Sequence, residues 1–208
     1  MKKLLICMLL SYCLGSLNPA ALIAKIKQKD LRQNGTGNLG ATNTMLLFGK
    51  GYGALVMLLD ITKSFLAVKL SVLLFPQTEW APLFFGLFAV LGHIFPFYLR
   101  FRGGKGLAAF GGVILAFDPL LFLLLLGISF SLMLCLNYSY AMPFSASILF
   151  PFFLVLRHCE LSTVLLACLL GATILFTHWS NFQKARKGRE IKIRGYLRSH
   201  FWPFGSKN

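Results

Sequence analysis

Acidic residues are scarce in this sequence. Only 6 Asp and Glu stand against 21 Lys and Arg in 208 residues, giving a formal net charge of +15. So basic a chain first suggests nucleic-acid binding. The cations, however, gather at the ends of apolar segments, as they do in the cytoplasmic loops of membrane proteins. We therefore expect no nucleic-acid partner and attribute the charge to anionic lipids or anionic substrates.

Paired cysteines and metal-binding clusters are also missing. The 5 cysteines are scattered, without a CxxC pair or a His/Cys group at metal spacing. A zinc site and a disulfide framework are therefore not expected. The cysteines are interpreted as small apolar packing residues, and we predict neither a metal nor a cofactor.

Long uncharged stretches fill much of the chain. Hydrophobic residues make up 57% of it, and the mean hydropathy is +0.71, more apolar surface than a water-soluble domain could bury. Segments suited to membrane helices cover residues 4–24, 51–75, 80–98, 106–117, 120–136, 138–156 and 161–182, with breaks at Asp118-Pro119 and Asn137-Tyr138. The first is interpreted as a retained helix, because no small-residue cleavage site precedes a soluble domain. Residues 106–117 are short for a crossing, so we expect them to be tilted, re-entrant or partly embedded in protein.

These segments predict an all-α integral membrane protein with about seven transmembrane helices. Cations cluster in residues 25–50, in residues 99–106 and from Lys184 to Lys207. Placing these three groups in the cytoplasm requires an odd number of crossings, an outside N-terminus and a cytoplasmic C-terminus. We expect a single polytopic domain over residues 1–208, with a basic tail from about residue 183.

A first polar motif covers residues 34–43, NGTGNLGATN. Its Gly-x-Gly-x-x-Gly pattern matches the dinucleotide-binding fingerprint, but that fingerprint requires a βαβ unit, and here a membrane helix and a basic linker precede it. Its glycines instead let backbone amides approach an anion, and its side-chain donors are Thr36, Asn38, Thr42 and Asn43. The alternative is a polar turn at the start of a helix.

A second motif covers residues 99–106, LRFRGGKG. It is not a Walker A loop, because no Ser or Thr follows the lysine and the preceding glycine is absent. Glycine amides, the start of the next helix and Lys105 could instead hold a phosphate monoester. The alternative is that Arg100, Arg102 and Lys105 only anchor the membrane interface. His93, at the end of the preceding segment, is either a packing residue or a functional one.

A third motif covers residues 178–190, where His178 and Asn181 share one helical face before a basic tail. Asp60 and Lys63 form a further pair, three residues apart within a predicted span. Charges at that depth are unfavourable, so we expect them to pair or to face a polar cavity. Together the three motifs predict a composite phosphate site at the cytoplasmic surface.

The order and spacing of these pieces carry a resemblance over nearly the whole chain. They comprise Gly15-Ser16, DLRQNGTGNLGATN, FGKGYG, Asp60 with Lys63, GHIFPFYLRFRGGKGLAAFGG, His178, Asn181 and Gly188-Arg189-Glu190. The chain resembles the bacterial acyl-phosphate-dependent glycerol-3-phosphate acyltransferases of the PlsY family. The resemblance implies transfer of an acyl group from acyl phosphate to the 1-hydroxyl of sn-glycerol 3-phosphate. It also implies a location in the bacterial cytoplasmic (inner) membrane among membrane lipids, with no obligate protein partner.

The resemblance also implies roles for individual residues. Catalytic roles fall on Thr36, Asn38, Thr42, His178 and Asn181. Substrate-binding roles fall on Gly35, Gly37, Asn43, Lys63, His93, Gly103, Gly104, Lys105, Gly106 and Lys184. Asp60 and Glu190 are expected to be structural. Whether His178 or a substrate phosphate takes the proton stays open.

Three positions depart from the family pattern. Thr36 stands where the family usually has Ser, and Leu46 and Lys184 stand where it usually has Arg. A guanidinium group can bind phosphate through two parallel hydrogen bonds. Leu46 cannot replace such a group, and Lys184 offers only a single ammonium charge, so both departures weaken bidentate phosphate recognition. These departures motivate the alternative of an inactive or repurposed lipid-binding paralogue. The charges within a span motivate another, a small organophosphate transporter.

Overall fold

The structure is a computed structural model, and it describes residues 2–190 and 192–195. Its elements in these ranges are helices, apart from one isolated bridge between Tyr138 and Lys192. They are α1 (Lys2–Ser16), α2 (Pro19–Ile26), α3 (Ala41–Phe48), α4 (Lys50–Leu74), α5 (Ala81–Ile94), η1 (Phe97–Leu99), α6 (Leu107–Phe117), α7 (Pro119–Leu136), α8 (Ala141–Leu156) and α9 (Leu161–Arg186). The predicted all-helical fold is confirmed for this part of the chain.

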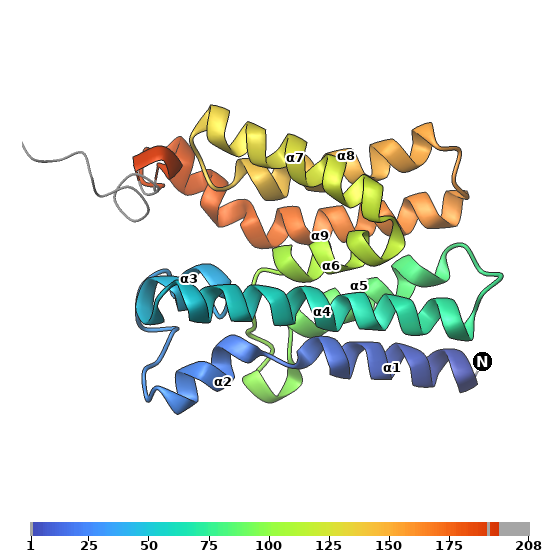
Figure 1. Ribbon diagram of the computed structural model, residues 1–208, viewed down its shortest axis with the longest axis horizontal. Coiled ribbons are helices and arrows are strands. Elements are labelled where there is room, and N and C mark those ends of the chain that lie inside the picture. Colours follow the sequence, from blue (N-terminus) through green and yellow to red (C-terminus); the bar gives the residue numbers. More distant parts are fainter. Residues whose placement is uncertain (1, 191, 196–208) are drawn as a thin grey trace, which may run out of the picture.

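The helices lie alongside one another and run back and forth along the long axis of the molecule (Figure 1). The start of α1, the turn between α4 and α5, and the turn between α8 and α9 lie at one end. The short helices α2 and α3, the turn between α7 and α8, and the end of α9 lie at the other end. The basic segments that sequence placed in the cytoplasm therefore belong to one half of the molecule.

Four helical stretches are long and apolar enough to cross a membrane: 2–26, 81–99, 119–136 and 161–186. The 25-residue α4 is also long, but it carries four charged side chains, and α6 and α8 are shorter apolar helices. Each of the seven segments expected from sequence coincides with one of these helices. Seven crossings and the orientation of the termini stay predictions.

The predicted breaks at Asp118-Pro119 and Asn137-Tyr138 are confirmed. The Asp118 side chain caps α7, accepting a hydrogen bond of 2.9 Å from the amide of Leu121. Asn137 ends the same helix with a φ of 64°, in the left-handed region that asparagine tolerates. Both breaks therefore follow from the capping and backbone preferences of Asp118 and Asn137, which can be read from the sequence.

Helix α9 extends past residue 183, where the basic tail is expected to begin. Helix α9 continues to Arg186, and Gly188, with a φ of 66°, turns the chain after it. Gln, Lys, Ala and Arg are good helix formers, and basic side chains in a last turn favour the helix dipole. The polar residues after position 182 end the apolar span, but the helix continues through them to Arg186. Arg198 and Lys207, counted with this tail, lie outside the described residues.

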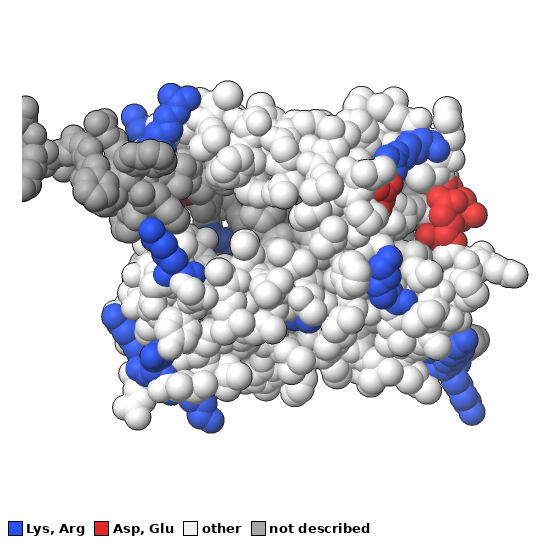
Figure 2. Space-filling view, viewed as in Figure 1, with Lys and Arg blue, Asp and Glu red and all other residues white. Residues whose placement is uncertain are grey.

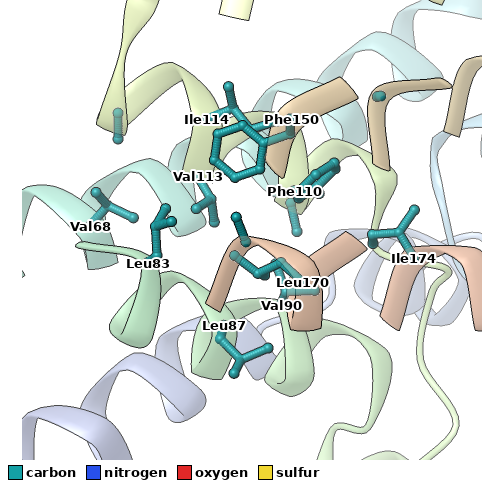
Figure 3. Close-up of a cluster of buried hydrophobic side chains, with 14 of the residues drawn as sticks. Val68, Leu83, Leu87, Val90, Phe110, Val113, Ile114, Phe150, Leu170 and Ile174 are labelled. Atoms are coloured by element: carbon teal, nitrogen blue, oxygen red, sulfur yellow. The ribbon is translucent and has the colours of Figure 1, made fainter. Parts of the chain in front are cut away.

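A hydrophobic core binds α4, α5, α6, α8 and α9 together (Figure 3). Short α6 is central to it, contributing Phe110, Val113 and Ile114. A side chain at Gly112 would collide with the carbonyl oxygen of Ile61, so α6 lies directly against α4. Of the alternatives expected for residues 106–117, partial embedding in protein is confirmed, and within the second motif at their start Gly104 and Gly106 are buried.

The outer surface is apolar. Large hydrophobic side chains such as Leu73, Leu120 and Phe176 are more than 70% exposed, at 78%, 75% and 76%. On the face in Figure 2, most Lys and Arg side chains gather toward the two ends of the molecule, and the belt between them is largely uncharged. An apolar surface this extensive is stable in contact with lipid rather than water.

Candidate functional site

Asn43 organises the first motif, residues 34–43. Its Oδ1 accepts a hydrogen bond of 2.7 Å from the amide of Thr36, and its Nδ2 donates to the carbonyl oxygens of Leu31 at 2.7 Å and Asn34 at 3.1 Å. The side chain is buried, so its amide is committed to shaping the loop. Asn43 therefore supports its own loop in this structure, and the substrate-binding role expected for it stays a prediction.

The remaining polar side chains of the first motif are more accessible. Thr36 and Thr42 are exposed, and Asn38 is half-buried. Gly35, with a φ of 64°, lies against Asn43, and any Cβ there would collide with its Oδ1. Gly37 is also left-handed, with a φ of 73°. The two glycines form the turn that presents Thr36, whereas Thr42 lies in the first turn of α3.

The second motif, residues 99–106, folds back on the end of α5. The amide of Gly103 donates to the carbonyl oxygen of Ile94 at 2.8 Å, and that of Gly104 donates to His93 at 3.2 Å. These carbonyls end a helix and need such donors. Both glycine amides therefore have partners within the protein, and the phosphate-binding role expected for Gly103 and Gly104 stays a prediction. Their lack of side chains also matters, because a Cβ on either residue would collide with His93.

Lys105 joins the second motif to α9. Its Nζ donates a hydrogen bond to Oδ1 of Asn181, and its carbonyl oxygen accepts one of 2.7 Å from the hydroxyl of Thr177. Gly106 follows with a φ of 89° and turns the chain into α6. The first amides of a helix have no partners within it, so the start of α6 and Lys105 together provide anion-binding groups.

The electrostatic surroundings of Lys105 favour an anion. Burial lowers the pKa of its ammonium group, and the positive charge of Lys184 lowers it further, whereas Glu190 opposes the shift. A bound phosphate would supply the missing negative charge and stabilise the protonated lysine. Lys184 itself is exposed. Two cations near one another are unfavourable until an anion joins them.

Asn181 is oriented from both sides. Its Nδ2 donates to Oε1 of Glu190 at 3.1 Å, and the same carboxylate oxygen accepts a hydrogen bond from Ser139. A carboxylate only accepts hydrogen bonds and an ammonium only donates them, so the amide has one orientation that satisfies both Glu190 and Lys105. The structural role expected for Glu190 agrees with this arrangement.

His178 lies one helical turn before Asn181 and is buried. Its Nδ1 is 3.0 Å from the carbonyl oxygen of Ile174, which only accepts hydrogen bonds. Nδ1 therefore carries the proton, and the lone pair resides on Nε2. Lys105 is close enough to interact electrostatically with this ring. The arrangement gives a neutral imidazole that can accept a proton beside a cation.

Further contacts tie the segment just before the first motif to the second motif, and the first motif itself to Asn18. Nη2 of Arg32 donates to the carbonyl oxygens of Arg102 at 2.7 Å and Leu99 at 3.1 Å, and Nδ2 of Asn18 lies 3.5 Å from the carbonyl oxygen of Leu39. Because Lys105 is bonded to Asn181 and Thr177 of α9, and Gly104 lies against the carbonyl oxygen of Leu39, the second motif lies between the other two. Sequence reasoning missed Arg32, Asn18, Thr177 and Ser139, since nothing in their local patterns indicates a distant backbone partner.

Asp60, Lys63 and His93 form a buried cluster between α4 and α5, with exposed fractions of 2%, 5% and 4%. Nζ of Lys63 lies 2.8 Å from Oδ1 of Asp60 and 2.9 Å from Nδ1 of His93, which is itself 3.2 Å from Oδ1 of Asp60. Lys63 also donates to the carbonyl oxygen of Leu17 at 2.5 Å. The expected pairing of Asp60 with Lys63 is confirmed.

This cluster engages Lys63 and His93 within the protein, and the substrate-binding roles expected for them stay predictions. Both side chains are occupied by one another and by Asp60, and the His93 ring lies against Gly104 of the second motif. The cluster therefore connects the break between α1 and α2 to the second motif. The charges that suggested a transporter are paired inside the bundle. Among the described residues, no group of three or more His, Cys, Asp or Glu is placed to hold a metal ion.

Comparisons with known proteins span nearly the same region. The sequence model of the family described as glycerol-3-phosphate acyltransferase matches residues 5–188. A glycerol-3-phosphate acyltransferase of Aquifex aeolicus (strain VF5) is 36% identical over 191 residues, covering 92% of this chain and 100% of the relative. A glycerol-3-phosphate acyltransferase of Lacticaseibacillus casei (strain BL23) is 35% identical over 203 residues, covering 95% of this chain and 97% of the relative.

Solved structures agree with these relatives. A crystal structure of PlsY (YgiH), an integral membrane glycerol 3-phosphate acyltransferase, in its glycerol 3-phosphate form has a TM-score of 0.89 at 35% identity, covering 96% of this chain and 99% of that one. The lysophosphatidic acid form has a TM-score of 0.84 at 34% identity, covering 91% and 95%. The resemblance seen in the motifs is confirmed across the fold.

Proposed function

The chain belongs to the glycerol-3-phosphate acyltransferase family, and from this premise we propose that it transfers a fatty acyl group from acyl phosphate to the 1-hydroxyl of sn-glycerol 3-phosphate. The products are 1-acylglycerol 3-phosphate and phosphate. The observation that carries the proposal is the link between Lys105 and Asn181, which brings a phosphate-binding cation to the helix that bears His178. Two related structures hold the substrate and product classes this reaction requires.

The reaction needs positioning more than covalent help. The substrate hydroxyl oxygen attacks the acyl carbonyl carbon, the bond from that carbon to the phosphate oxygen breaks, and phosphate leaves with the electron pair. Acyl phosphate is already activated, so orientation and charge neutralisation supply most of the catalysis. Lys105 and the start of α6 hold the glycerol 3-phosphate, and Thr36, Asn38 and Thr42 hold the phosphate of the acyl donor. Nε2 of His178 takes the hydroxyl proton.

The membrane setting supports this chemistry. Acyl phosphate carries a fatty chain that partitions into lipid, whereas glycerol 3-phosphate is water-soluble. A site close to the basic end of the bundle is open to both phases. We place the protein in the bacterial cytoplasmic membrane, with seven crossings and the site facing the cytoplasm.

The function is tested by phosphate release from acyl phosphate with the purified protein in detergent. Release should depend strictly on glycerol 3-phosphate, and lysophosphatidic acid should appear in equal amount. The lipid product identifies acyl transfer, whereas phosphate release without it identifies hydrolysis. A folded protein that binds glycerol 3-phosphate without transfer would support the repurposed paralogue instead.

The orientation gives a prediction of its own. Single cysteines at positions 30, 102 and 190, in a cysteine-free background, should react with a membrane-impermeant thiol reagent only from the cytoplasmic side. A cysteine at position 78, in the turn between α4 and α5, should react only from outside. Labelling of positions 102 and 190 from opposite sides would contradict a single cytoplasmic site.

Replacing Lys105 by alanine should raise the KM for glycerol 3-phosphate. A charge-assisted hydrogen bond contributes up to about 3 kcal/mol, so the increase can reach roughly a hundredfold. The exposed Lys187, which follows α9, is the matched control, because its replacement by alanine removes the same charge outside the site. Equal effects from Lys105→Ala and Lys187→Ala in steady-state kinetics would mean that only general surface charge attracts the substrate.

Restoring the family's usual arginine at position 46 should increase kcat/KM. Leu46 lies in α3, one turn after Thr42, and is half-buried. An arginine there can reach a phosphate held by the first motif, and one such bond is worth ~1.5 kcal/mol or more, about tenfold. Leu46→Met, which adds length without charge, is the control. A loss of activity in Leu46→Arg alone would place this side chain in the core and contradict the assignment of the first motif.

A further inference from the structure

The segment after α9 folds back over the end of α7. We call residues 188–190 and 192–194 the strap. Gly188 turns the chain, and the amide of Arg189 donates to the carbonyl oxygen of Lys184 at 2.8 Å. The strap then meets the turn between α7 and α8, where Lys192 forms an antiparallel bridge with Tyr138. The match to the family model ends at residue 188, so most of the strap lies beyond it.

Arg194 fastens the strap to α7. Its Nε donates to the carbonyl oxygen of Leu134 at 3.0 Å, and its Nη2 lies 3.4 Å from that of Cys135. Its amide donates to Oδ1 of Asn137 at 2.7 Å, and the amide of Ile193 donates to the carbonyl oxygen of Asn137 at 3.2 Å. The last carbonyls of a helix lack partners within it and carry partial negative charge, so a guanidinium group is well suited to this position.

Glu190 lies between this attachment and the site. Its carboxylate is held by Ser139, from the turn between α7 and α8, and by Asn181 of α9. The strap therefore fixes the carboxylate over the gap between two helices. Because Glu190 orients the amide of Asn181, it also determines which atom of that amide faces Lys105. Without the carboxylate, the amide could rotate and present its NH₂ group to the ammonium.

We propose that Arg194 is a positioning residue for glycerol 3-phosphate binding, acting through Glu190 and Asn181 on Lys105. The inference rests on the proposed function only in taking Lys105 as the phosphate-binding cation. Arg194 contacts backbone groups of α7 and touches no group assigned to the reaction. Its role is to keep the strap docked, so that the carboxylate remains where the amide needs it.

The first experiment measures Arg194→Ala kinetics. We expect the KM for glycerol 3-phosphate to rise about three- to tenfold, the range for loss of one net hydrogen bond, with kcat changed less than twofold. Lys192→Ala is the matched control, since it removes one charge from the strap and leaves the backbone bridge in place. Arg194→Lys should recover part of the effect, because one ammonium group can still reach a carbonyl. Unchanged KM in Arg194→Ala would overturn the proposal.

A double-variant cycle separates positioning from general destabilisation. In a Glu190→Gln background the connection to Asn181 is already weakened, so Arg194→Ala should raise the KM little further. If the increase in KM in the double variant equals the product of the increases in the two single variants, the substitutions act independently, which would overturn the proposal. Hydrogen–deuterium exchange of peptides covering residues 188–195 should speed up in Arg194→Ala but not in Lys192→Ala. Unchanged exchange would show that Arg194 does not hold the strap, which also overturns it.

The failure of this inference differs from failure of the proposed function. A wild-type protein that transfers acyl groups, with Arg194→Ala kinetically identical to it, contradicts only the role of the strap. A wild-type protein without glycerol 3-phosphate-dependent transfer contradicts the proposed function. In that case, unchanged binding of glycerol 3-phosphate in Arg194→Ala, measured by calorimetry, would overturn the inference as well.

Discussion

Replacing His178 by asparagine should lower kcat by about 10²–10⁴, the range that a positioned general base contributes. Asparagine suits this position because its Nδ2 can take the place of Nδ1 of the imidazole, which lies 3.0 Å from the carbonyl oxygen of Ile174. The substitution therefore keeps the local hydrogen bond and removes only Nε2, the atom with the free lone pair. The KM for glycerol 3-phosphate should change much less than kcat, since Lys105 is retained.

His158 supplies the control for this substitution. It lies exposed in the turn between α8 and α9, with a φ of 55° that asparagine adopts readily. His158→Asn makes the same chemical change at the opposite end of the bundle from the end of α9 and should leave kcat unaltered. A loss of less than tenfold in His178→Asn would show that a substrate phosphate, rather than this imidazole, accepts the proton.

The helices and their breaks could be predicted because they depend on local properties of the sequence. Uncharged length predicts a membrane helix, and Asp118 and Asn137 interrupt helices through their own side chains and backbone angles. The end of α9 at Arg186 could not be predicted from hydropathy in the same way. Hydropathy reports where the environment changes, whereas a helix ends only where its backbone hydrogen bonds end.

The site was predicted less completely, because its roles depend on which distant groups meet. The glycine amides of the second motif resemble a phosphate loop in sequence, but the unpaired carbonyls of α5 take the amides of Gly103 and Gly104. Asn43 looks like a side-chain donor for substrate until its own loop is seen to use the whole amide. The sequence indicates which polar groups are present and in what order. Which of them bond to other parts of the protein, and which remain available to a substrate, is seen only in the folded structure.

Lys63 shows the same limit in a charged residue. Sequence placed it in a span and predicted a pair with Asp60, which the spacing of three residues allows on one helical face. The participation of His93 could not be predicted, because that residue comes from α5. The three-residue cluster explains how α4 carries charge at this depth. It also links Lys63 to the second motif, because the His93 ring that Lys63 contacts lies against Gly104.

Removing one member of this cluster should destabilise the protein strongly. Asp60→Leu leaves the ammonium of Lys63 buried without its carboxylate, and breaking a buried ion pair in this way costs about 3–5 kcal/mol. For a chain of this length, that loss corresponds to a fall in Tm of roughly 6–20 °C. Thermal unfolding in detergent, followed by circular dichroism, measures it. The second motif should loosen with it, because His93, which lies against Gly104, loses its contact with Asp60.

The double variant Asp60→Leu/Lys63→Met tests whether the charge or the packing is responsible. Replacing both partners with apolar side chains of similar size leaves no unpaired charge, so the Tm should return to within a few degrees of the wild-type value. Lys69→Met, on the exposed face of the same helix, removes a lysine without breaking a buried pair and should have little effect.

We expect the double variant to be stable yet to bind glycerol 3-phosphate more weakly, because His93 then lacks both partners that fix its ring against Gly104. A double variant as unstable as Asp60→Leu would mean that shape, rather than charge pairing, holds α4 against α5. Wild-type binding in a stable double variant would show that the cluster supports the fold alone and does not position the second motif.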